Sequence, residues 1–382
     1  MAASSGTSAP EHALQPPYTF GVPWPELNDG VSYTDVIRLT ENAKTLIDFY
    51  STKYKSSAPL QGWIHRIRNG QVSIDGYVVT DPQTVLSVGA KIVYLRLPWN
   101  EACAPFMLQV LYEDDDLVAI NKPSGLQVLP GGLFQQRTVL TQLQWKVWKQ
   151  VTYSSSSRAI KEPHPVPVHR LGRGTSGILL CAKTKLAKTT LATYFAEGTS
   201  LVGDNRIVEG EVGRVQKISK LYRALVTGIL EQDEMLVEKP IGVMNYPGVA
   251  KGLYVASSTG KPALSKIQVL YRDNCKDQTL VQVQIHSGRP HQIRIHLAFI
   301  GHPLVGDSLY QIGGQPCLHE AKIIDDSFAE DGGYRKPERP VPGDSGYHLH
   351  AHRLVLRHPS TNKVDLTIII TRLNNMRRHS IA

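Results

Sequence analysis

A short polar loop near the middle of the chain could hold a ligand. The stretch HRLGRGTSG, residues 169–177, carries two arginines and three glycines. Glycine lets a backbone approach a bulky ligand closely, and the arginines supply positive charge nearby. The apolar residues 178–182 that follow are typical of a buried strand. The pattern predicts a ligand-binding loop before a strand, yet no carboxylate lies between His169 and Lys183 to act on the ligand.

A second pattern that could do chemistry is HLHAHR near the C-terminus. Its histidines alternate as metal ligands on one strand face would, at positions 348, 350 and 352. No carboxylate or cysteine nearby completes a ligand set, so the sequence favours no metal site.

The bulk properties of the chain bound the classes of partner. The 382 residues include 42 Lys and Arg against 33 Asp and Glu, and the formal charge of +9 favours polyanions. No apolar run reaches the length of a membrane helix. The scattered cysteines predict neither a zinc ribbon nor a disulfide framework, and they indicate a reducing intracellular compartment, whether cytoplasm, nucleus or organelle: Cys103, Cys181, Cys275 and Cys317.

Residues 42–99 have the pattern of a small domain, preceded by a tail (1–41) that we expect to be disordered. A short amphipathic helix over 43–54 is followed by a second helix and by short strands between turns. The order resembles the S4 RNA-binding module, which would present His65, Arg66, Arg68 and Lys91 to RNA. The alternative is an ordinary small α+β domain with solvated charges.

A larger domain begins near residue 105. We expect a strand over 117–120 that ends in a turn at 121–125, then a helix over 138–150 with Thr138 as its N-cap. After the glycine-rich loop, the pattern predicts a strand and a second amphipathic helix over 186–198.

Four blocks of this domain resemble the RluA-type pseudouridine synthases, in the family's order. They are LVAINKPSGLQVLPG (117–131), HRLGRGTSGILLCAK (169–183), KLYRALVTG (220–228) and HSGRPHQIRIHLAFIGHPLVGDSLY (286–310). The resemblance covers residues 105–372 and leaves a basic tail at 373–382. It implies an α+β pseudouridine synthase fold, with a mixed, mainly antiparallel sheet and flanking helices, after the S4-like module.

The resemblance also implies a reaction. Members of this family isomerise uridine within structured RNA, such as tRNA or rRNA, to its C5-linked isomer, and they need neither a metal nor an organic cofactor. The target base must leave its stack and enter a pocket. In this family, an aspartate acts as nucleophile or base, and an arginine keeps it ionised.

The family's site residues carry over incompletely. Tyr222 matches the tyrosine that packs against the target uracil, and Arg294 matches the arginine that pairs with the aspartate. Gly172 occupies the position of the aspartate itself. We expect further RNA contacts from Lys122, Arg170, Arg173, Arg289 and His291, although the last two could instead brace their loop.

The absence of a carboxylate at position 172 has two consequences. Loss of a nucleophile can reduce a rate on the order of a million-fold. A buried Arg294 without a partner would cost about 3–5 kcal/mol. The Arg294 charge could pair with a carboxylate from elsewhere in the chain, either one of the acidic residues 114–116 or Asp307, which more typically fastens a loop. It could also pair with an RNA phosphate or stay hydrated. The resemblance therefore predicts a pseudouridine synthase, and the alternative is a non-catalytic RNA-binding protein of the same fold.

Overall fold

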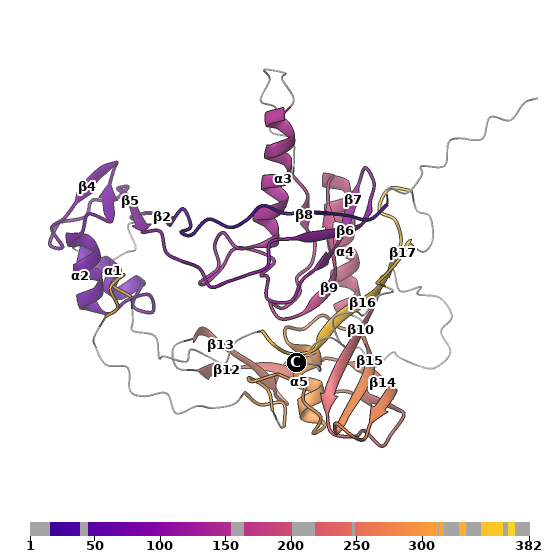
Figure 1. Ribbon diagram of the computed structural model, residues 1–382. Helices are drawn as coiled ribbons and strands as arrows, with labels where there is room; N and C mark the ends of the chain where they lie inside the picture. Colours follow the sequence, from indigo (N-terminus) through magenta and orange to yellow (C-terminus); the bar gives the residue numbers. More distant parts are fainter. Residues whose placement is uncertain are drawn as a thin grey trace, which may run out of the picture.

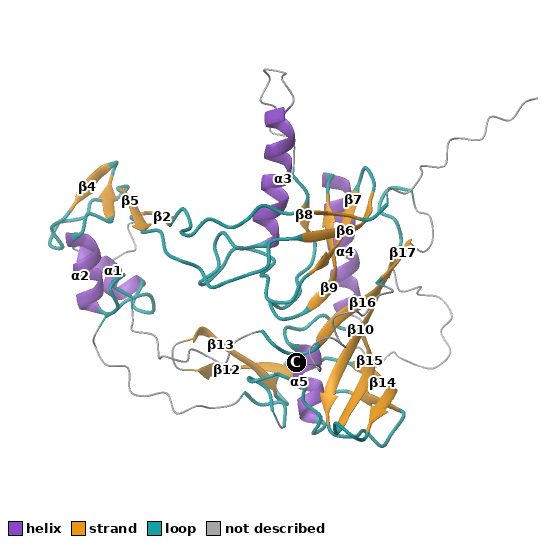
Figure 2. Cartoon of the chain, in the orientation of Figure 1, coloured by secondary structure: helices purple, strands orange, loops and turns teal. Residues whose placement is uncertain are grey.

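The computed structural model contains a small N-terminal unit and a large sheet with helices on both faces (Figures 1 and 2). The structure describes residues 16–38, 45–153, 164–200, 218–246, 249–311, 313–316, 328–333, 345–361 and 366–370. The predicted basic tail at 373–382 lies outside these residues.

The N-terminal unit, at the left of Figure 1, is a helix pair beside a four-stranded antiparallel sheet. The helices are α1 (Leu46–Lys53) and α2 (Leu60–Arg68). The strands lie in the order β2 (Val31–Val36), β5 (Lys91–Arg96), β3 (Val72–Ile74) and β4 (Tyr77–Val79). Thr45 and Asp48 form a capping box that starts α1. The apolar face of this amphipathic helix is buried: Leu46, Ile47, Phe49 and Tyr50.

The prediction of a disordered tail over residues 1–41 is wrong for the part that the structure describes. Strand β1 (Tyr18–Phe20) pairs with β6 (Leu108–Glu113) of the large sheet, and β2 pairs with β5. Both strands find their partners more than fifty residues away in the chain, and a local reading of the sequence cannot show such pairing. The small domain therefore begins before residue 42.

The large sheet is mixed and mainly antiparallel, as the resemblance implied. Its path runs β1-β6-β7-β9-β16-β10-β15-β14-β11, and β8 and β17 add to β9 and β16. The pair β16–β9 is parallel, and the other pairings within the described part of this sheet are antiparallel. The remaining strand bounds are Leu117–Lys122 (β7), Val166–Pro167 (β8), Ser176–Ala182 (β9), Ile218–Thr227 (β10), Glu234–Val237 (β11), Ser265–Asp273 (β14), Gln278–Ile285 (β15), Leu349–Leu356 (β16) and Leu366–Ile369 (β17).

Three helices and a hairpin complete the domain. Helices α3 (Val139–Tyr153) and α5 (Gln292–Phe299) pack into the larger apolar cluster, and α4 (Lys185–Ser200) packs into a second one. Strands β12 (Ile241–Tyr246) and β13 (Val249–Ala256) pair with each other. As predicted, the Thr138 hydroxyl caps α3 by accepting from the backbone N–H of Thr141 at 3.2 Å. No helix in the described ranges is long and apolar enough to cross a membrane.

Candidate functional site

The glycine-rich loop runs from β8 into β9, and the turn after β7 holds it in place. The carbonyl of Arg173 accepts hydrogen bonds from the backbone N–H of Gly125 at 2.8 Å and from the Lys122 ammonium at 3.1 Å. The Ser124 hydroxyl donates to the carbonyl of Gly174 at 2.6 Å. Two blocks of sequence that lie about fifty residues apart therefore fold into one unit.

The end of this loop must be glycine. Gly177 has a φ of +107°, which side chains rarely adopt, and a Cβ there would lie 2.3 Å from the carbonyl oxygen of Ala351. This close approach is where β9 and β16 pair in parallel. It ties the loop to the strand that follows residues 345–348.

Arg294, on the first turn of α5, is buried and paired. The guanidinium donates to both oxygens of Asp307, with Nε–Oδ2 at 2.7 Å and Nη2–Oδ1 at 2.9 Å. Both side chains are at most 2% exposed. A bidentate pair of this kind neutralises a buried charge and satisfies its hydrogen bonds with good geometry. The carboxylate that pairs with Arg294 is therefore that of Asp307.

Asp307 also fastens its own loop. Its Oδ1 atom accepts from the backbone N–H groups of Leu309 at 3.0 Å and Tyr310 at 3.1 Å. With two further bonds from Arg294, the carboxylate is saturated by protein donors. Asp307 therefore has a structural role in this site. A carboxylate whose oxygens are all hydrogen-bonded to the protein is poorly suited to act as a nucleophile.

The other candidate carboxylates lie at the opposite end of β9 from the loop. The Asp114 carboxylate bonds with His358 at 2.8 Å, and the Asp116 carboxylate accepts from the Thr184 hydroxyl at 2.8 Å. Lys183, one residue after the end of β9, donates its backbone N–H to the carbonyl of Asp116. These acidic residues brace the turn between β6 and β7.

Two aromatic rings enclose the Arg294 guanidinium, and one of them reaches Gly172. The centroid of the Tyr347 ring lies 4.3 Å from the guanidinium carbon, and that of Tyr310 lies 4.9 Å away. A Cβ built on Gly172 would lie 2.6 Å from the Tyr347 hydroxyl oxygen. The same hydroxyl is 3.1 Å from the Thr175 hydroxyl. Position 172 and Arg294 are thus neighbours with one phenol between them.

Tyr222 belongs to the same apolar cluster as Tyr347 and Ile293. It lies on β10 where the pairing with β16 is irregular: Tyr222 pairs with Ala351, and Leu221 pairs with Arg353. Burial raises the pKa of the Tyr222 phenol to about 12, so it is neutral at physiological pH.

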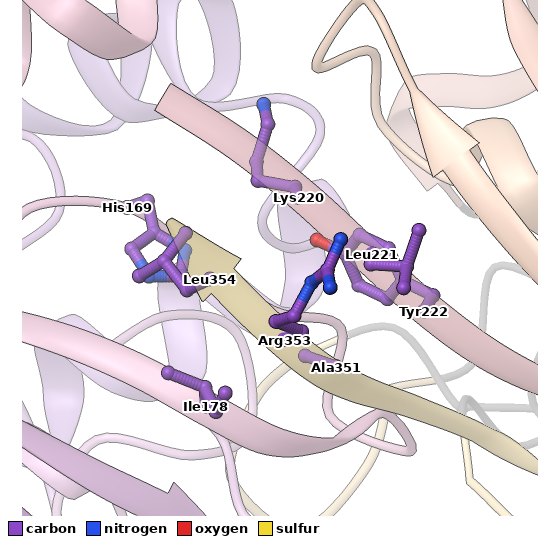
Figure 3. A pocket seen from close by; sticks show the side chains of 8 residues that line it. All are labelled: His169, Ile178, Lys220, Leu221, Tyr222, Ala351, Arg353 and Leu354. Atoms are coloured by element: carbon purple, nitrogen blue, oxygen red, sulfur yellow. The ribbon is translucent and has the colours of Figure 1, made fainter. Parts of the chain in front are cut away.

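A small pocket opens beside Tyr222 (Figure 3). Lys220, two residues before Tyr222, lines it, and burial lowers the pKa of its ammonium to about 8. His169 lines it too and accepts a hydrogen bond at Nε2 from the backbone N–H of Leu180 at 3.0 Å. Desolvation, and to a lesser extent Lys220, lowers the pKa of His169 to about 3, so the ring is neutral and shapes the loop. The lining is completed by Ile178, Leu221, Ala351, Arg353 and Leu354.

Comparison with known proteins identifies this arrangement. The profile of the family described as RNA pseudouridylate synthase matches residues 116–299. The chain is 61% identical over 370 residues to RNA pseudouridine synthase 5 of Oryza sativa subsp. japonica, covering 95% of this chain and 93% of that protein. It is 65% identical over 344 residues to RNA pseudouridine synthase 5 of Arabidopsis thaliana, covering 89% and 92%. The chain belongs to the RNA pseudouridine synthase family.

The likeness extends to bacterial members of the family. Ribosomal large subunit pseudouridine synthase D of Vibrio vulnificus (strain CMCP6) is 30% identical over 260 residues, which is 67% of this chain and 68% of that protein. The pseudouridine synthase fold inferred from the four sequence blocks is confirmed by these matches together with the mixed sheet.

Two of the basic residues expected to contact RNA are buried, which corrects those predictions. The Lys122 ammonium donates to the carbonyls of Leu126, Pro123 and Arg173 at 2.7, 2.8 and 3.1 Å. Arg66 lies over the ring of Trp63, and its Nε donates to the carbonyl of Asp331. Residues 328–333 cover this face of α2, and nothing in the local pattern of 42–99 indicated that cover.

The other basic residues of the predicted RNA-binding set reach the surface to different extents. Arg68, Lys91 and Arg170 are exposed. Half-buried His65 bonds with Asn69, and Arg173 stacks on Phe134 with 4.9 Å between the guanidinium carbon and the ring centroid. Arg289 donates from Nε to the carbonyl of Pro262, and His291 bonds with the Tyr310 hydroxyl. The last two contacts are those of loop braces, and they leave both residues partly exposed.

The alternating histidines lie on β16 and just before it. His350 bonds through Nδ1 with the Ser176 hydroxyl at 2.9 Å, and burial lowers its pKa to about 4. No cluster of three or more potential ligands from His, Cys, Asp and Glu occurs among the residues that the structure describes.

Sequence reasoning missed Tyr347 and Thr175. The two hydroxyls meet across 172 positions of the chain. Tyr347 precedes the histidine-rich block without belonging to it, so only the folded chain shows that its ring joins the loop to α5.

Proposed function

We propose that this protein isomerises uridine to pseudouridine in structured RNA. The observation that carries the proposal is the buried Arg294–Asp307 pair, whose guanidinium contacts two tyrosine rings beside the loop that contains Gly172. The non-catalytic alternative would use Arg294 to bind an RNA phosphate. Asp307 already neutralises that charge, so the arginine serves the architecture of the site and is not an anion receptor.

The reaction breaks the C1′–N1 bond of uridine and forms a C1′–C5 bond. One proton leaves C5 and one is gained at N1, so the change is an isomerisation without oxidant, reductant or cofactor. The uracil must leave its stack to be turned over. Tyr222 supplies an apolar ring face for the base, and the neutral Tyr222 phenol can donate a hydrogen bond but is a weak base at neutral pH.

RNA binding uses the exposed cations on both units. Arg170 and partly exposed Arg173 flank the Gly172 position, and Arg68 and Lys91 are exposed on the N-terminal unit. Contacts of this kind are made to phosphates and weaken as salt rises. The exposed thiols of Cys103 and Cys275 favour a reducing compartment.

The test is release of tritium from C5-labelled uridine in unmodified tRNA and rRNA transcripts. Because the reaction must remove the hydrogen at C5, tritium release measures turnover directly. We expect release by the native protein and a strong reduction in Tyr222→Ala, which removes the ring against the base. The control is Tyr271→Ala, at an exposed tyrosine of β14, which should react at the native rate. Absence of release with the native protein, at concentrations at which it binds these transcripts, would support the non-catalytic alternative.

A further inference from the structure

The space beside Gly172 is already filled by the hydroxyl of Tyr347. The first atom of any side chain at position 172 would lie 2.6 Å from this oxygen and 3.3 Å from the Thr175 hydroxyl. Real Cβ atoms essentially never approach a neighbour to under 3.0 Å. An aspartate at 172 and Tyr347 in its present position therefore exclude each other.

Two contacts fix where the Tyr347 hydroxyl lies. Its ring packs against the Arg294 guanidinium, which is itself held by both oxygens of Asp307. At the other end, the hydroxyl meets that of Thr175, three residues after Gly172. Backbone bonding adds to this order, because the Thr175 N–H donates to the carbonyl of Gly172 at 3.0 Å. A phenol with few alternative positions is preorganised to meet a ligand.

We infer that Tyr347 is a catalytic residue of this protein, whose hydroxyl occupies the place of the family's carboxylate and donates a hydrogen bond to the uracil. This inference rests on the proposed function. An unperturbed phenol has a pKa of about 10, so a tyrosine is a donor at neutral pH whereas a carboxylate is a base or nucleophile. With glycine in place of aspartate, the site therefore offers the uracil a hydrogen-bond donor in place of a base or nucleophile.

The step assisted is cleavage of the bond between the sugar and the base. When C1′–N1 breaks, its electron pair remains on the uracil, and the negative charge spreads onto the carbonyl oxygens of the ring. A phenol O–H aimed at this charge stabilises the transition state more than the ground state. The uracil then turns, the C5 electron pair attacks C1′, the C5 proton leaves to solvent and N1 takes a proton from solvent. Tyr347 keeps its own proton throughout.

Tyr347→Phe tests the catalytic role because it removes one oxygen and keeps the ring against Arg294. In tritium release under single-turnover conditions, with the same unmodified transcripts, we expect the rate to fall on the order of 10²- to 10³-fold. The affinity for the transcripts should stay within about twofold. Thr175→Val removes the hydroxyl–hydroxyl bond but keeps the phenol, so a merely structural role predicts equal losses in the two variants. We expect the smaller loss in Thr175→Val.

A second measurement, which does not depend on activity, tests whether the Tyr347 hydroxyl fills the space beside Gly172. Gly172→Ala places a Cβ against the phenol oxygen, and overpacking of this kind should lower the Tm by roughly 2–10 °C. In the Tyr347→Phe background most of this loss should disappear. Equal losses in both backgrounds would overturn the claim that the hydroxyl fills the space.

The outcomes separate the two proposals. A native rate in Tyr347→Phe overturns the inference and leaves the proposed function intact. No release by the native protein overturns the proposed function, and the catalytic role of Tyr347 with it.

Discussion

The two sides of the candidate site differ in how their polar atoms are held. On the α5 side, Arg294 and Asp307 form a buried pair whose hydrogen bonds come from within the protein, and Asp307 also binds two backbone N–H groups. On the loop side, Gly172 offers no side chain, and the nearest polar atom is a phenol that comes from a distant segment. By the sequence resemblance, Arg294 matches the family's arginine and Gly172 stands at the position of the family's carboxylate. This difference is the basis of our inference that the Tyr347 hydroxyl assists the reaction in place of a carboxylate.

Breaking the α5 pair should have the largest effect. Arg294→Ala leaves the Asp307 carboxylate buried without its guanidinium, which should reduce the free energy of unfolding by about 3–5 kcal/mol. Urea unfolding measures this loss, and tritium release should fall below detection. Arg294→Ala with Asp307→Asn removes both charges and should recover part of the stability but no activity. Recovery of activity in the double variant would show that Arg294 is dispensable.

The α5 side should also make stability depend on pH. Burial lowers the pKa of His296 to about 4, and its ring bonds with Ser265 and with the carbonyl of Lys239. A depressed histidine pKa means that the unfolded chain binds more protons below about pH 6.5. His296 should therefore contribute a loss of about 1.4 kcal/mol per pH unit between about pH 6.5 and 4.

The measurement for His296 is urea unfolding at several pH values. His296→Gln should be less stable at pH 7 and should show a flatter decline below pH 6.5. His302→Gln, at a partly exposed ring after α5 that bonds with the carbonyl of Thr227, is the matched control for the loss of an imidazole. An unchanged slope in His296→Gln would contradict this assignment.

On the loop side, Lys122 sets the position of the glycine-rich turn. Lys122→Met removes an ammonium that donates to three carbonyls and should cost roughly 2 kcal/mol or more of unfolding free energy. We expect a lower Tm and slower tritium release. The salt dependence of RNA binding should not change, because the ammonium is fully buried.

Arg68→Ala should have the smallest effect on stability. In contrast to Lys122→Met, it should change the salt dependence of RNA binding and leave the stability unchanged. Arg68 is exposed near the end of α2, so its loss should leave the Tm unchanged. RNA binding should weaken modestly, and the slope of log K against log salt should become shallower by about 1. Affinity and slope both at native values would remove α2 from the RNA surface.

The sequence was sufficient to predict the mixed sheet, from the order of four blocks. The roles of Tyr222 and Arg294, inferred from their motifs, stay predictions. The sequence was insufficient where a side chain pairs with a distant part of the chain. Lys122 and Arg66 were predicted to bind RNA because a basic residue in a turn or helix resembles a solvated one, and only packing shows the carbonyls that surround each of them.

The loop side was the hardest to predict. The sequence shows that Gly172 removes a carboxylate but not what fills the space, since Tyr347 is brought there by the pairing of β9 with β16. For the same reason the sequence does not single out the partner of Arg294, which is Asp307 in the folded chain.

The most direct test of the account compares tritium release by the native protein with release by Gly172→Asp. We predict turnover by the native protein and slower turnover by Gly172→Asp, because the new side chain must displace the Tyr347 hydroxyl from beside position 172. Release that appears only in Gly172→Asp would contradict the account, since it would mean that the native site binds RNA and lacks the group that carries the reaction.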